Sequence, residues 1–516
     1  MGKSSCRGAV LSLLLVGVVL AGWGCSAPHD PQTVVMLIES SPLNLDPRIG
    51  TDAQSERISS LIFDSLLRRD RSSNLQPWLA ERWESPDPLT YIFHLRRDVR
   101  FHDGKPLTAR DVLYTFQSLL SGRIKSIKAS SYGLIASVEA SDDFTVVFRL
   151  KEPHASFLWN LTQGAIGIVP EGSAEELPRH PIGSGPFRFL SATQDENVIL
   201  ERNPNAWATP PRIERVEFKV VPDATTRALE LRKGTADIAL NSLTADMVEV
   251  LRQEKQLKVL QEPGTTYQYL AFNLESQKLT PAVRQAIAYG INLEPLVAHL
   301  WRNMVRPANS ILPPQHWAYA ADAPSYPYNP EKAMELLDEV GFNPGPDGVR
   351  LRLQMKTSTD QTGRELAAVL QEQLRKIGIA LDIRSYEFAT FYADITRGSF
   401  ELYSLRWAAG NDDPDIFEYC FHSQKIPPAG ANRGHYRNPE VDRLIETARA
   451  STDLAGRRED YVQIQHILNL DLPYIHLWYL DTVCVYNQRL RNIHLFPTGN
   501  YDFLTEIEVA AAPLAE

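Results

Sequence analysis

Three places in the chain hold residues of the types that acid-base or nucleophilic chemistry uses. His102 and Asp103 are adjacent in FHDGKPLTARDV, Ser184 stands between two glycines in IGSGPF, and Asp412 and Asp413 are neighbours. These types could supply a catalytic pair, a nucleophile, or two carboxylates acting as general acid and base. Their surroundings in the sequence decide between these roles and structural ones.

The spacing around these residues does not support catalysis or metal binding. The chain has no H-E-x-x-H pair for zinc, no G-x-S-x-G elbow around Ser184, no Walker A loop and no G-x-G-x-x-G fingerprint. Two adjacent carboxylates in a polar loop do not establish the separation across a substrate that catalysis needs. We therefore predict no enzyme activity, no metal site and no cofactor.

The His102 stretch has instead the features of a corner between a strand and a helix. Asp103 followed by Gly104 is typical of a turn in which the side chain bonds to the backbone. Thr108 and Asp111 have the spacing of a capping box at the start of a helix. We expect turn chemistry and a helix cap at this point of the chain.

The first 24 residues have the layout of an export signal. Lys3 and Arg7 precede an apolar run over residues 9–22, which is shorter than a membrane-spanning helix and is followed by small residues and Cys25. The segment LAGWGCSAP resembles a lipoprotein signal, in which the cysteine is acylated and becomes the new first residue. Because the two residues at the start of the usual motif differ here, secretion without a lipid is the alternative.

The rest of the chain has the composition of a large globular protein. The whole chain has 516 residues, 43% of them hydrophobic and 22% charged, which is too many for one core and predicts two or three. Loss of residues 1–24 removes two basic residues and no acidic one, which changes the formal charge from -10 to -12. No basic patch is present, so we expect no nucleic-acid partner. For Cys420 and Cys484, a disulfide and two buried free thiols remain equal alternatives.

Alternating and periodic stretches predict an α/β fold in two regions. In the first, strands are expected in VVMLIES, TVVFRL, NVILER, VEFKVV and ADIAL, and a helix from Ala224 that Asp223 caps and Gly234 ends. In the second, a helix begins at Pro330, and LRLQMK, GRELAAVLQEQLRKIG and IALDIRSY form a strand-helix-strand unit. The next strand, in FELYSLRW, ends in the loop 408–414. Ligands gather beyond the carboxyl ends of such strands, so this loop is the first binding-site candidate.

With these residues in place, the chain resembles the large extracytoplasmic solute-binding proteins of bacterial ABC importers, in the peptide, oligopeptide and nickel group (family 5). The stretch FHDGKPLTARDV matches the most specific part of the family signature. Further matches follow in the family's order from about Val34 to the C-terminus, in LNLDP, LQPWLAERWE, IGSGPF, NPNAW, AFNLES, VRQAIAYGINLEPLV and NPEKAMELLDEVGF.

The resemblance implies an α/β fold of the periplasmic-binding-protein type II class, in which a hinge joins two lobes and an extra domain is inserted. The signal peptide and a spacer would precede the lobes. The implied ranges are 1–24 for the signal peptide, 25–33 for the spacer, 34–61, 181–272 and 489–516 for lobe I, 62–180 for the inserted domain, and 273–488 for lobe II.

The resemblance also implies a function, which is capture of a solute without chemistry. A peptide or peptide-like solute would bind in the cleft between the lobes, the lobes would close, and the closed form would deliver it to a membrane permease with its ATPase. The protein would be an exported monomer on the periplasmic or cell-surface side, anchored to the membrane by lipid on Cys25.

The sequence departs from peptide-binding relatives at the residue that pairs with a peptide's terminal ammonium. Those relatives have an aspartate three residues after the tryptophan of this strand, whereas here Gly410 has that spacing from Trp407. An ammonium buried without a partner is costly, so binding of free peptide N-termini is in question unless Asp412 or Asp413 takes the aspartate's place. Asp412 is the better candidate, because Asp413-Pro414 matches a structural Asp-Pro of the family.

The cleft residues that the resemblance suggests come from both lobes. For the tyrosines, core packing is an equal alternative, whereas Trp407 and the loop after it favour binding, and Arg406 beside Trp407 could bind a carboxylate or stack. The candidates are Ile49, Gly50, Thr51, Asp52, Tyr267, Tyr269, Tyr403, Arg406, Trp407, Ala408, Gly410 and Asp412.

Other functions stay open at this stage. Within the family, the solute could be a nickel chelate, an oligosaccharide, an opine or another amine, because membership does not fix the ligand. A secreted hydrolase on a lipid anchor would need a nucleophile or metal constellation that the sequence lacks. A ligand-sensing co-receptor could use the same two-lobed fold.

Overall fold

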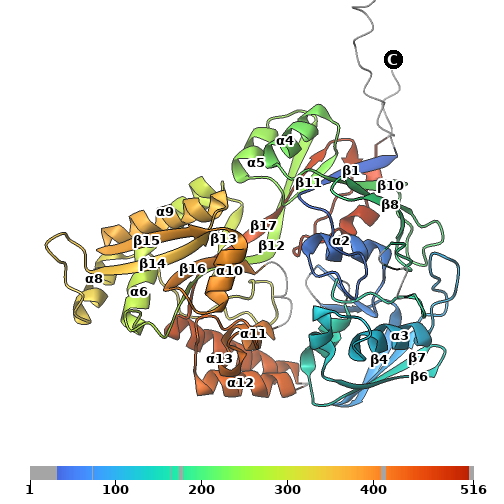
Figure 1. The fold of residues 1–516 in the computed structure, drawn as a ribbon, viewed down its shortest axis with the longest axis horizontal. Coiled ribbons are helices and arrows are strands. Elements are labelled where there is room, and N and C mark those ends of the chain that lie inside the picture. Colours follow the sequence, from blue (N-terminus) through green and yellow to red (C-terminus); the bar gives the residue numbers. More distant parts are fainter. Residues whose placement is uncertain are drawn as a thin grey trace, which may run out of the picture.

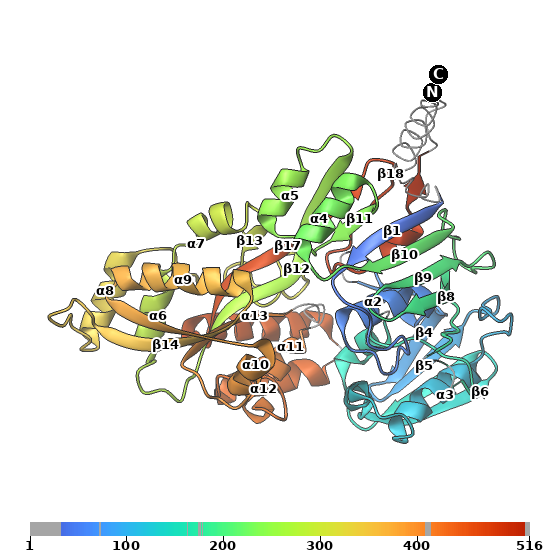
Figure 2. The ribbon, with the colours of Figure 1, turned by 45° about the horizontal axis from the view of Figure 1, so that its top comes forward.

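Two α/β lobes lie side by side, and a smaller domain rich in strands extends the N-terminal lobe (Figures 1 and 2). The computed structural model describes residues 32–71, 74–162, 164–173, 177, 179–407, 414–451 and 453–510. The predicted α/β class with an extra domain is confirmed.

The N-terminal lobe is built on one half of a large mixed sheet. Strand β1 (Thr33–Ile38) pairs in parallel with β10 (Arg215–Val220) and β11 (Ile238–Leu240), and β9 (Asn197–Arg202) and β8 (Phe187–Thr193) extend the sheet antiparallel. Every side chain of β1 after Thr33 is buried, which confirms the predicted buried first strand. Helices α2 (Ala53–Ile62), α4 (Ala224–Lys233) and α5 (Ala245–Leu251) pack on this part of the sheet.

The helix predicted from Ala224 is present as α4, with both of its end signals. Asp223 accepts a hydrogen bond from the backbone N–H of Thr226 at 2.7 Å, and Gly234 ends the helix in the left-handed conformation with φ 72°. Because α4 connects β10 to β11, which lie on either side of β1, the crossover is the parallel one that the strand-helix-strand order predicts.

The inserted domain has a four-stranded antiparallel sheet of its own. The strand order is β4 (Ala80–Asp87), β5 (Thr90–Leu95), β7 (Thr145–Leu150) and β6 (Ile135–Asp142), with helix α3 (Ala109–Leu120) packed on one face. Phe148 makes edge-to-face contacts with Phe93 and Phe116 in the core, with ring centroids 5.6 and 5.0 Å apart. A short ribbon of β2 (Leu67–Arg69) and β3 (Leu75–Pro77) leads into this sheet.

The C-terminal lobe contains the other half of the large sheet. Strand β14 (Leu351–Ser358) pairs in parallel with β15 (Ile379–Tyr386) and with β16 (Leu402–Trp407). The predicted strand-helix-strand unit is confirmed, with α9 (Gln361–Lys376) as its helix. The remaining elements of the lobe are α6 (Pro281–Gly290), α7 (Leu293–Pro295), β13 (Val305–Pro307), α8 (Pro330–Glu339), α10 (Phe388–Thr396), α11 (Ile416–Phe421), α12 (Pro439–Ala450) and α13 (Leu454–Asp471).

The two long strands β12 (Leu257–Phe272) and β17 (Tyr474–Asn487) connect the lobes. They pair antiparallel along most of their length, but the register shifts between Glu262 and Thr266. At Gly264, between these residues, an added Cβ would lie 2.3 Å from the carbonyl oxygen of Leu480, so only glycine fits. Each strand therefore belongs to both lobes, and the irregular stretch in the middle is the hinge between them.

The predicted lobe limits at residues 272 and 489 lie at the ends of these strands and stay predictions. The C-terminal segment returns to the N-terminal lobe, where the short strands β18 (Leu490–Arg491) and β19 (Glu508–Val509) pair and Tyr501 stacks on Phe218. Cys420 and Cys484 are buried free thiols in the cores of the C-terminal and N-terminal lobes respectively.

Asp64 holds the inserted domain to the N-terminal lobe. Its buried carboxylate accepts hydrogen bonds from Nε1 of Trp78 at 2.7 Å, from Nε1 of Trp207 at 3.0 Å and from the hydroxyl of Ser184 at 2.8 Å. The two indole rings contact each other, with centroids 4.6 Å apart. These donors come from the motifs LQPW, NPNAW and IGSGPF, so three separate parts of the signature meet at one carboxylate.

The FHDG corner completes this junction. Gly104 has φ 87°, Asp103 accepts from the backbone N–H of Lys105, and the Thr108–Asp111 capping box is present, all as predicted. His102 accepts a hydrogen bond from the backbone N–H of Gly183 through Nδ1 and lies 3.0 Å from the carbonyl oxygen of Gly185 through Nε2. The histidine is thus a structural residue that binds the glycine loop.

The loop itself needs its two glycines because it runs against another backbone. An added Cβ would lie 2.0 Å from the carbonyl oxygen of Ile62 at Gly183 and 2.6 Å from that of Leu61 at Gly185. Ser184 stands between them in a tight turn and donates to Asp64, which explains the IGSGPF motif without nucleophilic chemistry.

We predict that Asp64→Ala lowers the free energy of unfolding by at least about 3 kcal/mol, because it leaves three buried donors without an acceptor. Urea titration followed by tryptophan fluorescence measures this change. Asp98→Ala is the matched control, since Asp98 is an exposed aspartate of the same domain, and should change stability little. Equal effects of the two substitutions would contradict the role of Asp64.

We also predict that His102 makes stability fall in acid. Burial lowers the pKa of His102 from 6.5 to about 4, so its contribution is complete above pH 6.5 and is lost as the pH falls toward 4. This shift corresponds to about 3 kcal/mol. Between pH 7 and pH 4 the wild type should therefore lose about 3 kcal/mol more stability than His102→Gln.

Chemical unfolding at several pH values measures both slopes. His180→Gln, a substitution of an exposed histidine, should keep the wild-type slope. Parallel curves for the wild type and His102→Gln would show that the buried imidazole does not control acid stability.

Candidate functional site in the C-terminal lobe

A cavity of about 650 Å³ lies at the carboxyl ends of the parallel strands in the C-terminal lobe. Strands β14 and β16 end at its floor, and helices α9 and α10 begin at its rim. Figures 1 and 2 show these strand ends directed toward the N-terminal lobe. The cavity is therefore where the strand order predicts a binding site. It is lined by Gln268, Thr357, Ser358, Thr359, Asp360, Gly363, Glu387, Phe388, Phe391, Ser404, Leu405 and Arg406.

The two helix starts at the rim have their own caps. Asp360 accepts from the backbone N–H of Gly363 at 2.8 Å, and Glu387 accepts from that of Ala389, also at 2.8 Å. These carboxylates satisfy the free N–H groups and the positive ends of the helix dipoles. The rim is therefore polar and acidic, while Phe388, 54% exposed, offers an apolar surface beside it.

Arg406, a predicted site residue, lies in this cavity. Its Nε donates to Oε1 of Gln268 at 3.1 Å, and its guanidinium lies over the ring of Trp301, 5.1 Å from the centroid. Gln268 is fixed in turn, because Nε1 of Trp478 donates to the same oxygen and its own amide donates to Ser404. The arginine side chain is thus fixed at the cavity through Nε, and its Nη1 and Nη2 groups are available to bind a solute.

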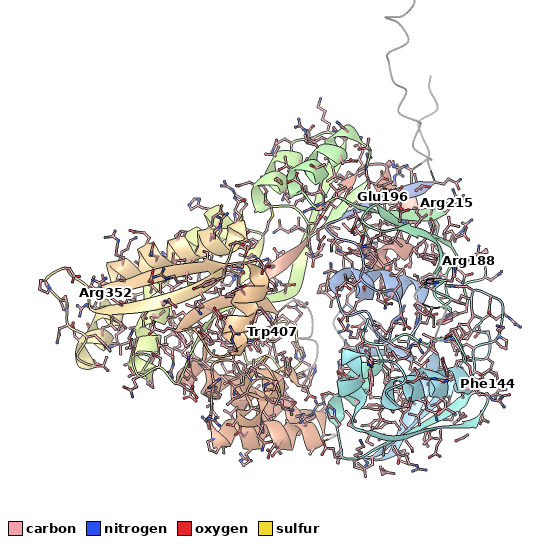
Figure 3. The ribbon with its side chains drawn as sticks, viewed as in Figure 1. Phe144, Arg188, Glu196, Arg215, Arg352 and Trp407 are labelled. Atoms are coloured by element: carbon pink, nitrogen blue, oxygen red, sulfur yellow. The ribbon has the colours of Figure 1, made fainter. Side chains whose placement is uncertain are left out.

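Trp407, the last residue of β16, lies on the side of the C-terminal lobe that faces the N-terminal lobe (Figure 3). Its ring stacks on Tyr269 with centroids 6.5 Å apart and meets Tyr419 edge-on at 6.0 Å. The side chain is partly buried, so one part of it packs on the core and the rest is accessible.

The three predicted tyrosines, Tyr267, Tyr269 and Tyr403, are fully buried in the core of the C-terminal lobe. The hydroxyl of Tyr267 is hydrogen-bonded to Nδ1 of His476, whose Nε2 lies 3.0 Å from Oδ1 of Asn469. This chain of bonds gives Tyr267 a structural explanation. The hydroxyls of Tyr269 and Tyr403 interact with each other instead, and that of Tyr403 also with Arg433.

Residues Ile49 to Asp52 lie on the other lobe, at the start of α2. Asp52 caps this helix by accepting from the backbone N–H of Ser55 at 2.9 Å. An added Cβ on Gly50 would lie 2.3 Å from the carbonyl oxygen of Asn44, so this loop is tightly packed. Thr51 is exposed beside them. These residues and the cavity beside Arg406 belong to different lobes.

Ala408, Gly410 and Asp412 lie outside the described residues, as do Asp413 and Cys25. Their roles stay predictions, and with them the exchange of aspartate for glycine at residue 410.

Several site residues have little signal in the sequence. Gln268 is one polar residue in a buried stretch of a strand. Trp301 follows a helix and is not part of any motif. Arg433 lies 26 residues beyond Trp407 in an irregular segment, yet its guanidinium lies over the Trp407 ring, 5.5 Å from the centroid. These residues come together only in the folded structure. The Asp360 cap, by contrast, can be predicted from its position just before the helix.

The lobes also touch away from the hinge. Nη2 of Arg449 on α12 donates to Nε2 of His154 in the inserted domain at 2.8 Å, and the same nitrogen of His154 lies 3.4 Å from Asp415. Burial lowers the pKa of His154, which favours the neutral imidazole that can accept this bond. The inserted domain therefore contacts the C-terminal lobe directly.

A second and larger cavity, of about 810 Å³, lies on the N-terminal lobe beside the Asp64 junction. Its lining combines arginines, acidic residues and the two tryptophans of the junction, and all of it belongs to the N-terminal lobe and inserted domain. No residue of the C-terminal lobe lines it, just as no residue of the N-terminal lobe lines the cavity beside Arg406. Only the cavity beside Arg406 lies at the carboxyl ends of parallel strands and includes a predicted site residue. The cavity beside Arg406 is the better candidate for the main site.

The fold and the signature motifs agree with one known family. Residues 74–427 match the family described as bacterial extracellular solute-binding proteins, family 5. The chain belongs to this family. The dipeptide-binding protein of Escherichia coli (strain K12) is a relative of this family 5 chain, 27% identical over 95% of the chain and 97% of its own length.

Solved structures support the same family 5 fold. The periplasmic binding protein DppA from Helicobacter pylori, in complex with the peptide STSA, is 27% identical and has a TM-score of 0.77, covering 93% of this chain and 98% of its own. NikZ from Campylobacter jejuni, in complex with Ni(L-His), is also 27% identical, with a TM-score of 0.79 over 93% of this chain and 100% of its own. The predicted type II periplasmic-binding-protein fold is confirmed.

The described parts of the chain contain neither a metal site nor a membrane-spanning helix. No group of three or more His, Cys, Asp or Glu side chains is arranged to hold a metal ion there. Likewise, none of the helices among the described residues is long and apolar enough to cross a membrane.

Proposed function

We propose that this protein is the extracytoplasmic receptor of an ABC importer, which binds a peptide or peptide-like solute between its lobes and delivers it to a membrane permease and ATPase. The observation that carries the proposal is the hinge in β12 and β17 beside a polar cavity that faces the opposite lobe. Membership of family 5 and the peptide complex of a relative support the same conclusion.

Closure follows from the position of the site. A solute in the cavity beside Arg406 can also contact the N-terminal lobe only when the lobes are together, so its binding energy favours the closed form by the difference in affinity alone. The polar groups at the cavity that are not buried include hydroxyls and the guanidinium of Arg406, which can bind solute through water and so accept varied side chains.

The protein acts without chemistry in this proposal. The two sequence motifs that suggested catalysis are structural, since His102 and Ser184 bind the junction between the inserted domain and the N-terminal lobe. A non-peptide solute of the family, such as a nickel chelate, is the alternative, and the relative in complex with Ni(L-His) is its support.

The proposal places the mature protein outside the cytoplasm as a monomer with a lipid on Cys25. It rests on the charged start, the short apolar run and the cysteine that follows them. Attachment would keep the receptor close to the permease, which raises its effective concentration there.

Solute bound to the protein purified under native conditions should be a peptide of a few residues, identified by mass spectrometry after denaturation. Unfolding and refolding the protein removes the solute. Adding the solute back to this ligand-free protein should reduce its radius of gyration in small-angle X-ray scattering, because the lobes close. Arg406→Ala should lower affinity for that solute at least about tenfold, which is the loss of one charge-assisted hydrogen bond.

Arg352→Ala is the matched control, because Arg352 is an exposed arginine of the same lobe far from Trp407 (Figure 3) and is paired with Asp347. It should bind as the wild type does. Release of a chemically altered product from an added solute would instead make the protein an enzyme and refute the proposal.

For the lipid anchor we predict that Cys25→Ser moves the exported protein from the membrane fraction to the soluble extracytoplasmic fraction. Metabolic labelling with a radioactive fatty acid should mark the wild type and not the variant. Cys6→Ser, in the part of the signal that would be removed, is the control and should behave as the wild type. A labelled Cys25→Ser protein would exclude this cysteine as the attachment point.

A further inference from the structure

The contact between the inserted domain and the C-terminal lobe is built around a buried histidine. His154, 9% exposed, lies between β7 and the short 3-10 helix η2 (Ala155–Leu161), and α12 packs on that helix. Nε2 of His154 accepts a hydrogen bond from Nη2 of Arg449 at 2.8 Å and lies 3.4 Å from Oδ2 of Asp415. The two lobes therefore share a hydrogen bond that exists only while they touch here.

Arg449 is fixed for this bond by two carboxylates of its own lobe. Its Nη1 donates to Oε1 of Glu418 on α11 at 2.8 Å, and its Nε lies 3.3 Å from Oδ1 of Asp415. Glu418 also forms an ion pair with Lys425 at 3.1 Å. The guanidinium is thus held in place from one side, and His154 is the acceptor that the inserted domain adds.

The imidazole of His154 makes no hydrogen bond within its own domain, as far as the described residues go. His154 directly precedes η2, but its side chain makes no capping bond to that helix. Its Nδ1 has no partner in the described part of the chain. The polar contacts of this side chain among the described residues are thus with the C-terminal lobe, which indicates a role between the lobes and not within the domain.

Protonation of this histidine would break the contact. An imidazolium has no free lone pair, so Nε2 could no longer accept from Arg449, and two positive groups would lie 2.8 Å apart. Burial is the main cause that lowers the pKa of His154, and the charge of Arg449 lowers it as well. The carboxylates that face the imidazole raise the pKa without reversing that direction; they are Asp415 and Glu418 at the start of α11 and Glu152 in its own segment.

The direction of the pH effect follows from this difference between the touching and the separated lobes. When the lobes separate, the imidazole leaves both its buried position and Arg449, so its pKa returns toward the ordinary 6.5. A group whose pKa is lower in the touching form stabilises that form fully above pH 6.5 and loses this contribution as the pH falls. Acid therefore favours separation of the lobes at this contact.

Helix α11 connects the contact to the predicted solute site. Glu418, which holds Arg449, and Tyr419 are consecutive residues of this helix. The ring of Tyr419 meets the ring of Trp407 edge-on, with centroids 6.0 Å apart. A solute at Trp407 and a change at the contact therefore act on the same helix.

We propose that His154 and Arg449 form a pH-sensitive latch, which holds the lobes together at neutral pH and releases them, and the solute with them, in acidic surroundings. This inference concerns the regulation of the receptor, and its link to solute release rests on the proposed function. An exported protein meets the pH of its surroundings directly, so the latch would respond over the range in which histidine titrates.

Small-angle X-ray scattering of the ligand-free, refolded protein tests the latch without any solute. The wild type should have a larger radius of gyration at about pH 5.5 than at about pH 7.5, on either side of the ordinary pKa of histidine. His154→Gln keeps an acceptor for Arg449 and cannot titrate, so it should stay compact at both pH values, whereas His154→Ala should be expanded at both. His94→Gln is the matched control, because His94 is bonded to Glu84 inside the inserted domain, and it should respond as the wild type does.

Thermal unfolding separates the latch from a structural role of the histidine. At neutral pH, His154→Ala should unfold at the same temperature as the wild type, because the side chain it removes joins two lobes and supports neither core. A clearly lower unfolding temperature would make His154 a structural residue and overturn the latch. The same conclusion would follow from equal radii of gyration of the wild type at the two pH values, or from an unchanged pH response in His154→Gln.

An equimolar mixture of tripeptides measures the link to solute release. In native mass spectrometry the wild type should capture at least about threefold less peptide at the lower pH, because the lost hydrogen bond stabilises only the form in which the lobes touch. His154→Gln should capture equal amounts at both pH values. Equal capture by the wild type would overturn the regulation of release. Capture of no peptide at either pH would overturn the proposed function, whereas the scattering result would still decide whether the latch exists.

Discussion

The hydrogen bonds to the carboxylate of Asp64 are the interaction on which the rest of the architecture depends. Two indole N–H groups and one hydroxyl, from the inserted domain and from two loops of the N-terminal lobe, share a single buried acceptor. Burial raises the pKa of Asp64 and the three donors oppose that rise, so the carboxylate and its donors need each other. The junction makes the inserted domain and the N-terminal lobe one body, against which the other lobe can move.

The C-terminal lobe shares the large sheet with the N-terminal lobe, and the two long strands of that sheet form the hinge. Strands β12 and β17 run through both lobes, and their register changes at Gly264, where no side chain fits. Beyond this point β12 carries Gln268, which lines the cavity beside Arg406, into the C-terminal lobe, so the hinge and part of the site are consecutive parts of one strand. A rotation at the hinge therefore moves the site as a rigid unit.

Local features of the fold could be predicted because they depend on near neighbours in the chain. The Asp223 cap, the Gly234 stop, the FHDG corner and the strand-helix-strand unit all follow from residues within one or two turns of each other. The motif resemblance added the overall architecture and the family. Arg406 and Trp407 could be named because they end a strand where ligands gather.

The rest depended on contacts between distant segments. Nothing in the sequence near Arg433 shows that it meets Trp407, or that the hydroxyl of Tyr267 is bonded to His476. For the same reason, Asp64 has no recognisable motif although three motifs converge on it. For the three tyrosines, core packing and solute binding were equal alternatives in the sequence. All three are buried in the core, and they differ only in the hydrogen bonds of their hydroxyls.

The bond between His154 and Arg449 sets a condition on how the lobes can separate. The two lobes are joined at the hinge and also touch at this second point. To separate, they must break the second contact or rotate about the line through the hinge and the contact. Opening therefore involves either a twist or the loss of this contact. The inserted domain provides none of the residues that line the cavity beside Arg406, yet it shares in the free-energy difference between the open and closed forms.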